Sequence, residues 1–476
     1  MLRESPPLNS NNPLIGTKYD PLVGDVYTLH LARVNERRPV IASENICDTQ
    51  GRLLLQKGAP VTGATAQEIV DTKLLLPIEY SIVIDNEIDG NQLEKDFIAV
   101  MRGDDILHSI HDRYSLDTLL HQQCSSYQSY PLLRQKITVL AERMPETYNR
   151  SLYCAWLAML IAKEMRLPRQ EINAVFLGAL CHDIGMLHVN PQVLGKSDAL
   201  TAEEWRELQT HVVIGQKILA CIDGLPSQVS LAVLEHHERC DGTGYPSGKV
   251  ESELSLLGQI IALADSVIAV YHNRFKPHGR SWRDVIPVIQ MNNQAYFYRN
   301  FEILTTILRR SEMPQPGVVG GDGMPDFIEK FIQQQGDMKA RFKRFEKLLL
   351  SFGYTHGDRK LHALQNVFLH IATSINGSGI FQNNYGEWLE QVKSKCLSQT
   401  YSEVEDAYLM LEEVSFHLQR LNRMIQIYAS SGSCKDKAIQ EALEAELEKE
   451  SQDDRVDAPI RNIHTRLDDE ETLITE

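Results

Sequence analysis

The sequence predicts a mainly α-helical protein with a small, β-rich N-terminal α+β module and a C-terminal helical extension. Apolar residues recur at helical spacing through most of residues 97–430. Residues 20–95 instead show short apolar runs separated by turn-forming residues. The chain has 476 residues, which is too long for one ordinary core, so we expect two or three domains.

The N-terminal region divides into a disordered start and a small folded module. Residues 1–19 are rich in Asn, Pro and Ser, a composition that favours disorder. In the module that follows, apolar residues on both sides of the turn-like residues 48–51 predict a β-hairpin. A capping box of Thr65 and Glu68 predicts a short helix after the hairpin, and residues 81–84 predict another strand. No ligand is identified by these patterns, so an input or docking role and a purely structural role both stay open.

The predicted helical domain, residues 97–310, places reactive side chains at buried positions. Apolar residues at helical spacing lead into His182 and Asp183, so this pair is expected at the C-terminal end of a buried helix. A second helix, residues 257–271, is apolar nearly all round and has Asp265 in its middle. A buried carboxylate is costly unless it binds a metal or is satisfied by a neighbouring arginine or backbone group.

The C-terminal part of the chain predicts a second helical module behind a linker. Residues 311–324 are rich in Pro and Gly, which indicates the linker. Residues 325–430 show helical periodicity, which predicts a helical module. Residues 431–476 predict a charged helix that ends in an acidic tail.

The composition excludes several classes of partner and location. The net charge of −16 argues against duplex nucleic acid as a partner, because duplex binding requires a basic surface. Residues 1–25 lack a signal-peptide pattern, and the longest apolar run, residues 154–162, is far shorter than the ~20 residues of a membrane helix. We therefore expect a cytoplasmic protein without a membrane span. The eight cysteines include no CxxC pair, which indicates reduced thiols rather than a disulfide or zinc framework.

Four histidines and two aspartates are the candidate metal ligands of the chain. Neutral imidazoles and carboxylates that converge on one point are ligands for iron and other divalent ions. A lone histidine on a helix is more often an ordinary core or surface residue, but two adjacent histidines cannot share one apolar face. The candidate ligands are His182, Asp183, His211, His236, His237 and Asp265.

The segment from residue 236 to residue 248 reads His-His-Glu-Arg-Cys-Asp-Gly-Thr-Gly-Tyr-Pro-Ser-Gly. Its glycines allow the backbone to approach a ligand closely. Together with the His182-Asp183 pair upstream and Asp265 downstream, this segment resembles the HD-GYP subfamily of the HD-superfamily metal-dependent phosphohydrolases. The resemblance covers the core of the helical domain, residues 130–300, and the Gly-Tyr-Pro loop is specific to the subfamily.

This resemblance implies a helical HD-GYP bundle and a phosphodiesterase that hydrolyses cyclic di-GMP to pGpG or GMP in bacterial second-messenger signalling. His182 and Asp183 would form the catalytic centre, and Asp183 would bridge two divalent ions of iron or manganese. Ions ~3.5–4 Å apart activate a water and clamp the phosphoryl oxygens. Glu146 matches a glutamate that some members use for an additional metal. Some relatives have the same fold but no catalytic activity. The alternative function is therefore that of a catalytically degenerate signalling protein, which acts as a nucleotide sensor or a protein-interaction scaffold.

The resemblance also implies a substrate site and partners. Gly244, Tyr245 and Pro246 would lie beside cyclic di-GMP, and Arg274 matches an arginine that contacts the substrate phosphate. Lys276 lies near the second basic position of the family but one residue out of register. Signalling proteins are the expected partners of the N- or C-terminal modules, and an oligomer is compatible with the sequence.

Three positions depart from the family pattern. Arg150 stands where the superfamily places a histidine ligand, and arginine cannot bind a metal. It could pair with Glu146 one helical turn away, supply a fixed positive charge to the site, or mark an inactive site. Met186 replaces an expected lysine, and Ile268-Ala269 replaces an expected Asp-Ala pair.

Overall fold

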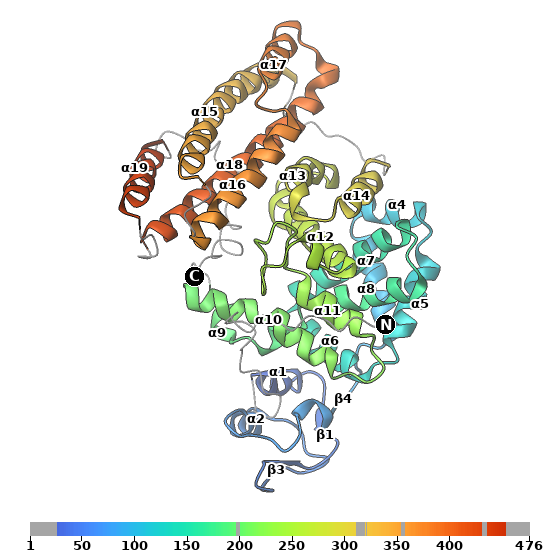
Figure 1. Ribbon diagram of the computed structural model, residues 1–476. Coiled ribbons are helices and arrows are strands. Elements are labelled where there is room, and N and C mark those ends of the chain that lie inside the picture. The colour runs from blue at the N-terminus through green and yellow to red at the C-terminus, as the bar shows by residue number, and fades with distance from the viewer. Residues whose placement is uncertain are drawn as a thin grey trace, which may run out of the picture. The chain divides into compact units, whose positions relative to one another are not determined.

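Figure 1 shows the computed structural model, which describes residues 26–196, 200–310, 319, 321–353, 358–430 and 436–453. The described chain is mainly helical with two small two-stranded sheets, which confirms the predicted fold class. It divides into two compact units, residues 1–268 and 269–476. None of the predicted domain boundaries lies at residue 268, and these boundaries stay predictions. The predicted disordered start, most of the predicted linker and the acidic tail lie outside the described residues.

The first unit opens with the small α+β module. The predicted hairpin is confirmed, because β2 and β3 pair antiparallel with Ile46 opposite Leu55. The predicted later strand is also confirmed, and it returns to pair antiparallel with β1, so that Val40 lies opposite Ile84. The elements are α1 Tyr27–Val34, β1 Val40–Ala42, β2 Ile46–Cys47, β3 Leu53–Leu55, α2 Gly63–Val70, η1 Ile78–Tyr80 and β4 Ile82–Ile84.

Two details of this module differ from the sequence predictions. The sequence patterns do not predict α1, which buries Tyr27, Leu31 and Val34. The predicted N-cap of α2, Thr65, is wrong by three residues. Thr62 is the N-cap, and its side chain accepts from the backbone N–H of Thr65 while the hydroxyl of Thr65 accepts from the N–H of Thr62.

Helices pack around two buried elements in the rest of the first unit. Helix α7 is buried continuously from Ser151 to Ala162 and packs against α6 and α8. Helix α12 is buried from Leu257 to Asp265. The elements are α3 Gly90–Arg102, α4 Asp105–Arg113, α5 Asp117–Tyr127, α6 Pro131–Arg143, α7 Pro145–Glu164, α8 Arg169–Cys181, η2 Ile184–His188, α9 Pro191–Leu194, α10 Ala202–Ala220, α11 Ser227–Glu235, η3 Glu251–Glu253 and α12 Leu256–Val270, in which the division between the units falls.

Among the described residues, one helical stretch is long and apolar enough to cross a membrane by length and composition alone. This stretch is Leu256–His278, and 61% of its most apolar window is buried inside the structure. It also carries Asp265, whose side chain belongs to the polar centre of the first unit. Burial and this carboxylate are typical of a core helix.

The second unit is a helical module whose longest members are α15, α16 and α18. Aromatic and aliphatic side chains from these helices, including Phe331, Phe345 and Phe368, form its core. A buried ion pair joins Arg274 to Glu413 on α18 at 2.7 Å. The elements are η4 Tyr271–Phe275, η5 Lys276–His278, η6 Trp282–Asp284, α13 Val285–Met291, η7 Asn293–Ala295, α14 Tyr298–Arg310, η8 Gly321–Gly323, α15 Met324–Ser351, α16 Arg359–Ser378, α17 Asn383–Lys395, η9 Ser398–Thr400, α18 Tyr401–Ser430 and α19 Lys437–Asp453.

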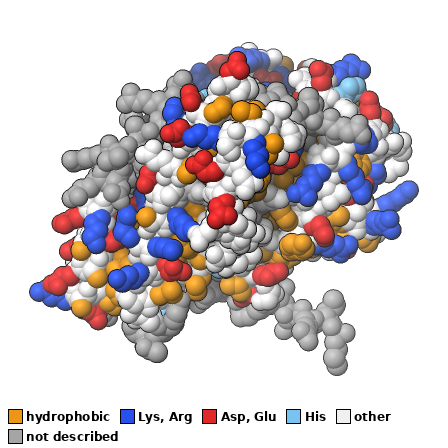
Figure 2. Space-filling model, turned by 90° about the horizontal axis from the view of Figure 1, so that it is seen from above, with side chains coloured by type: hydrophobic (Ala, Val, Ile, Leu, Met, Phe, Trp, Pro, Cys, Tyr) orange, Lys and Arg blue, Asp and Glu red, His pale blue; other side chains and the backbone are white. Residues whose placement is uncertain are grey.

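The surface carries charges of both signs. On the described part of the face shown in Figure 2, Lys and Arg side chains lie among Asp and Glu side chains. The chain as a whole has 48 Lys and Arg residues against 64 Asp and Glu residues, which makes it acidic. A phosphate-bearing ligand would therefore depend on local positive charge rather than on the overall field.

Candidate metal centre

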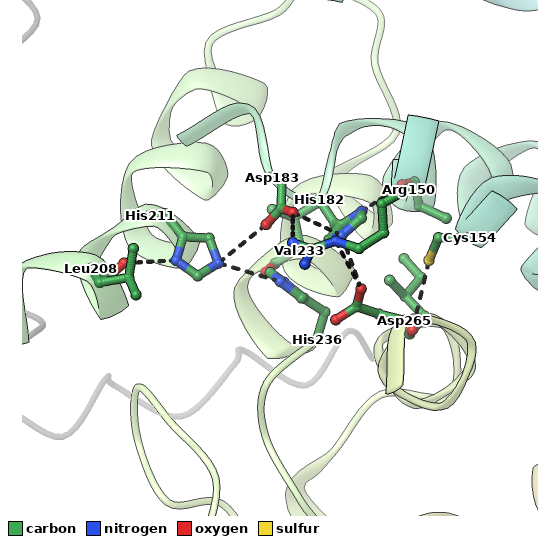
Figure 3. Close-up of polar contacts among 11 residues, drawn as sticks. Arg150, Cys154, His182, Asp183, Leu208, His211, Val233, His236 and Asp265 are labelled. Atoms are coloured by element: carbon green, nitrogen blue, oxygen red, sulfur yellow. Dashed lines mark hydrogen bonds and ion pairs between the residues drawn. The ribbon is translucent and has the colours of Figure 1, made fainter. Parts of the chain in front are cut away.

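The candidate ligands predicted from the sequence converge from four segments of the first unit. His182 caps the C-terminal end of α8, Asp183 follows it at the start of η2, and His236 caps α11 in the same way. His211 comes from α10 and Asp265 from α12. Figure 3 shows His182, Asp183, His211, His236 and Asp265 with their side chains directed toward one another.

Gly185 explains why Asp183 and His211 can meet. A side chain at Gly185 would place its Cβ 2.0 Å from the backbone oxygen of His211. Only glycine therefore allows η2 to lie against α10 at this point. Because η2 packs this closely against α10, the carboxylate of Asp183 lies 3.5 Å from the Nε2 of His211.

Three of the histidines have their rings fixed by backbone hydrogen bonds. In each ring Nδ1 donates to the carbonyl oxygen three residues earlier, at 2.7 Å for His182, 2.7 Å for His211 and 2.6 Å for His236. Because a carbonyl oxygen only accepts, the proton must lie on Nδ1. A neutral ring then presents the lone pair of Nε2, which is how metal-binding histidines are held in proteins.

The imidazoles of His211, His236 and His237 form one group, which we call the imidazole cluster. One nitrogen from each ring lies within 4.8 Å of the others. The Nε2 atoms of His211 and His236 are 3.5 Å apart. Two lone pairs at this distance repel each other unless a cation or a proton lies between them, so the cluster favours a bound cation.

The two carboxylates connect the cluster to the other side of the site. Oδ1 of Asp183 lies near His211, whereas its Oδ2 lies 3.3 Å from the Nε2 of His182 and 2.5 Å from a guanidinium nitrogen of Arg150. Oδ1 of Asp265 lies 3.4 Å from the Nε2 of His182 and 3.7 Å from the Nε of Arg150. Arg150 therefore faces the site from α7.

Burial and charge set opposite protonation states in these histidines. Burial lowers the pKa of His236 to about 3, and it also lowers the pKa values of His211 and His237. These three rings are neutral near pH 7, the state that binds a metal. Burial also opposes a charge on His182, but the carboxylates of Asp183 and Asp265 outweigh it and raise the pKa of His182 to about 10.

The donor set fits a divalent metal ion. The Nε2 of His182, the Oδ1 of Asp183 and the Oδ1 of Asp265 are buried without a hydrogen-bond partner among the described residues. Unsatisfied buried donors and acceptors are costly, and metal ions bind both imidazole nitrogens and carboxylate oxygens. Mixed imidazole and carboxylate ligands suit iron, manganese and zinc.

One residue at the site escapes the sequence analysis. Cys154 has its sulfur within 4.8 Å of ligand atoms of His182 and Asp265. It lies four residues after Arg150 on α7, so the helical spacing could have indicated it. Burial raises the pKa of its thiol well above the usual range. A neutral thiol is a poor metal ligand, so Cys154 lines the site as an apolar side chain.

The Gly-Tyr-Pro loop folds back onto His237. The Tyr245 ring stacks on the ring of His237, with centroids 4.7 Å apart, and its backbone N–H donates to the carbonyl of His237. A Cβ at Gly244 would lie 2.4 Å from that same carbonyl oxygen, so the turn requires glycine. Pro246 is buried behind it, and Glu238 accepts backbone hydrogen bonds from residues 247 and 249. The loop is thus attached to the imidazole cluster.

The remaining predicted residues lie in other surroundings. Glu146 is exposed in the first turn of α7, and Met186 lies in η2 directly after the Asp183 segment. Arg274 and Lys276 belong to the second unit. Within that unit the guanidinium of Arg274 is buried and donates to Glu413, while Lys276 is exposed. Their predicted contact with a substrate phosphate stays a prediction.

The segment that carries this site is similar to known proteins. Residues 117–299 match the family model of the HD domain. Among curated proteins, the chain is 35% identical over 155 residues to a cyclic di-GMP phosphodiesterase of Thermotoga maritima, covering 31% of this chain and 42% of the relative. It is 32% identical over 136 residues to a cyclic di-GMP phosphodiesterase of Pseudomonas aeruginosa (29% and 32%) and 34% identical over 127 residues to a 3'3'-cGAMP-specific phosphodiesterase of Vibrio cholerae (27% and 27%).

The matched segment contains every candidate ligand described above. Residues 117–299 thus carry an HD domain. The relatives that this segment resembles agree with the HD-GYP resemblance that the sequence motifs carry. The chain spans less than half the length of each of the three relatives.

Proposed function

We propose that this protein is a metal-dependent phosphodiesterase that hydrolyses cyclic di-GMP to pGpG or GMP in bacterial second-messenger signalling. One observation carries the proposal: His211 and His236 direct neutral Nε2 atoms at each other across 3.5 Å, beside the carboxylate of Asp183. This arrangement supports a cation-binding function, and the named relatives act on cyclic dinucleotides. Iron or manganese is the proposed ion, and the cytoplasm is the proposed location.

The residues present define the roles that hydrolysis would need. The imidazole cluster and Asp183 would hold the metal, which supplies a Lewis acid and a bound water of lowered pKa. The backbone hydrogen bonds to His211 and His236 keep their rings oriented before substrate arrives. Hydrolysis forms a bond from a water oxygen to phosphorus and breaks the phosphorus bond to a ribose 3'-oxygen. That oxygen takes up a proton as the water loses one.

Arg150 and the Gly-Tyr-Pro loop would bind the substrate. The side chain of Arg150 is 28% exposed, so its guanidinium can meet a phosphate oxygen while it contacts Asp183. Tyr245 carries an aromatic ring beside the cluster, which can contact a base by stacking. Arg274 is a further proposed phosphate contact, which would require it to share its guanidinium with Glu413.

A second candidate function is a nucleotide sensor without turnover, with signalling proteins bound through the N- or C-terminal modules. The contact of Arg150 with Asp183 is the observation in its favour, because it places a permanent cation on a metal ligand. The two functions differ in one measurable property. An enzyme releases linear product, whereas a sensor binds the cyclic dinucleotide and leaves it intact.

Turnover by the full chain tests the proposal. Protein reconstituted with Fe²⁺ or Mn²⁺ under reducing conditions should convert cyclic di-GMP to pGpG or GMP, as measured by chromatography, and a chelator should stop the reaction reversibly. His237→Ala should abolish turnover, whereas His108→Ala, a change at an exposed histidine of α4, should not. Binding without turnover would favour the sensor. If the protein hydrolyses 3'3'-cGAMP but not cyclic di-GMP, the proposed reaction holds and the proposed substrate is wrong.

A further inference from the structure

The carboxylate of Asp183 separates two different surroundings. Its Oδ1 faces the imidazole cluster, 3.5 Å from the Nε2 of His211. Its Oδ2 faces the Nε2 of His182 at 3.3 Å and the guanidinium of Arg150 at 2.5 Å. Figure 3 shows His211 on one side of Asp183 and Arg150 on the other. The carboxylate therefore connects a cluster suited to a metal with a cation that belongs to the chain.

Arg150 lies where a second cation would otherwise neutralise the two carboxylates. It contacts Asp183 through one terminal nitrogen, and its Nε lies 3.7 Å from the Oδ1 of Asp265. A guanidinium reaches about 2 Å farther from Cα than an imidazole Nε2, roughly one metal–nitrogen bond length. The charged end of Arg150 thus reaches about as far as a histidine at this position together with an ion bound to it.

The formal charge of the site also favours a single metal ion. Asp183 and Asp265 carry two negative charges, and Arg150 carries one positive charge that it keeps at physiological pH. Whether or not His182 carries a proton, one divalent ion already outweighs the negative charge that remains. A second divalent ion would add two further positive charges directly beside the guanidinium, where like charges repel strongly because little water screens them.

We propose that Arg150 is a built-in cation that takes the place of one of the two metal ions, so the site holds a single divalent ion. The imidazole cluster and Asp183 are its ligands, and His182 and Asp265 hold the Arg150 side of the site. The guanidinium also supplies the positive charge to a phosphate oxygen that a second ion would supply. This inference rests on the proposed metal-dependent function and changes its expected metal count from two to one.

Metal counting on the intact protein tests this assignment without any assay of activity. After reconstitution with Mn²⁺ and gel filtration, elemental analysis should find one equivalent in the wild-type chain and two in Arg150→His. Electron paramagnetic resonance should show an isolated Mn²⁺ in the wild type and a coupled pair in the variant. Arg169→His, which adds a histidine at an exposed position of α8, should stay at one equivalent. Circular dichroism confirms that each variant is folded.

Two tightly bound equivalents in the wild type, or none, would overturn the inference, and neither result depends on a variant. A folded Arg150→His protein that still binds only one equivalent would also overturn it. The proposed function fails separately. A wild-type protein with one ion and no turnover would support the single-ion site and contradict the proposed enzyme activity. Turnover by a wild-type protein with two ions would support the enzyme activity and contradict the single-ion site.

Discussion

A fully buried lysine joins the N-terminal module to the segment that carries Asp183. The side chain of Lys136, on α6, has no exposed surface, and its ammonium lies 2.9 Å from Glu79 of η1 and 3.0 Å from the Nε2 of His188. The same ammonium lies 3.2 Å from the ring centre of Tyr27 in α1. His188 ends η2, which begins directly after Asp183. One ammonium therefore holds two parts of the N-terminal module against the element that follows the metal ligand.

Removing the carboxylate of Glu79 should destabilise the first unit strongly. In Glu79→Gln the ammonium of Lys136 remains buried and loses its counter-charge, since its side chain is 0% exposed. Breaking a buried ion pair in this way costs about 3–5 kcal/mol. For a unit of this size, each kcal/mol lowers the midpoint of thermal unfolding by about 2–4 °C, so we expect a decrease of about 6–20 °C.

Thermal unfolding followed by circular dichroism and by calorimetry measures this effect. The double variant Glu79→Leu/Lys136→Met should be less destabilised than Glu79→Gln, because it leaves no unpaired buried charge. The matched control is Glu44→Gln, which breaks an ion pair of 3.1 Å with Lys57 whose side chains are 68% and 63% exposed. It should cost less than about 1 kcal/mol. Equal midpoints for Glu79→Gln and Glu44→Gln would show that burial of the Glu79–Lys136 pair adds nothing to stability.

Three further predictions concern the metal centre and the second unit. Gly185→Ala should lower metal content at least tenfold and should also lower the unfolding midpoint. The reason is that the new Cβ would lie 2.0 Å from the backbone oxygen of His211 and would push η2 away from α10. Normal metal content in this variant would contradict the prediction. The pKa of His182 is raised to about 10, so its ring is protonated at pH 7 and the metal is held by the neutral rings of the imidazole cluster. Metal affinity should therefore stay flat between pH 7 and 9, and calorimetry in buffers of different ionisation enthalpy should detect no released proton. If instead affinity rises toward tenfold per pH unit over this range, His182 is a ligand. Glu413→Gln leaves the guanidinium of Arg274 buried without its carboxylate and should destabilise the second unit by about 3–5 kcal/mol; an unchanged unfolding midpoint would count against the pair.

Local patterns predicted the elements that local physics determines. Helical periodicity placed His182 and Asp183 at the end of a buried helix, and the structure has α8 ending at Cys181 with His182 as its cap. The turn residues between Ile46 and Leu55 predicted the hairpin for the same reason, since turn chemistry involves only neighbouring residues. The convergence of the ligands followed from the motif resemblance rather than from periodicity.

Contacts between distant residues were beyond the sequence patterns. The sequence left three roles open for Arg150, and only the fold shows its guanidinium against Asp183, 33 positions later. The pairing of Arg274 with Glu413 spans 139 positions, and no local signal connects them. Both pairs depend on how helices pack in three dimensions, which one sequence does not specify at the level of single side chains.

Anomalous diffraction from crystals of the full chain grown with Mn²⁺ locates and counts the ions at this site. We expect a single anomalous peak within bonding distance of the Nε2 atoms of His211 and His236 and of the Oδ1 of Asp183, with the guanidinium of Arg150 on the other side of that carboxylate. A second metal peak between Asp183 and Asp265 would contradict the role of Arg150. No peak at the imidazole cluster would contradict the metal centre itself.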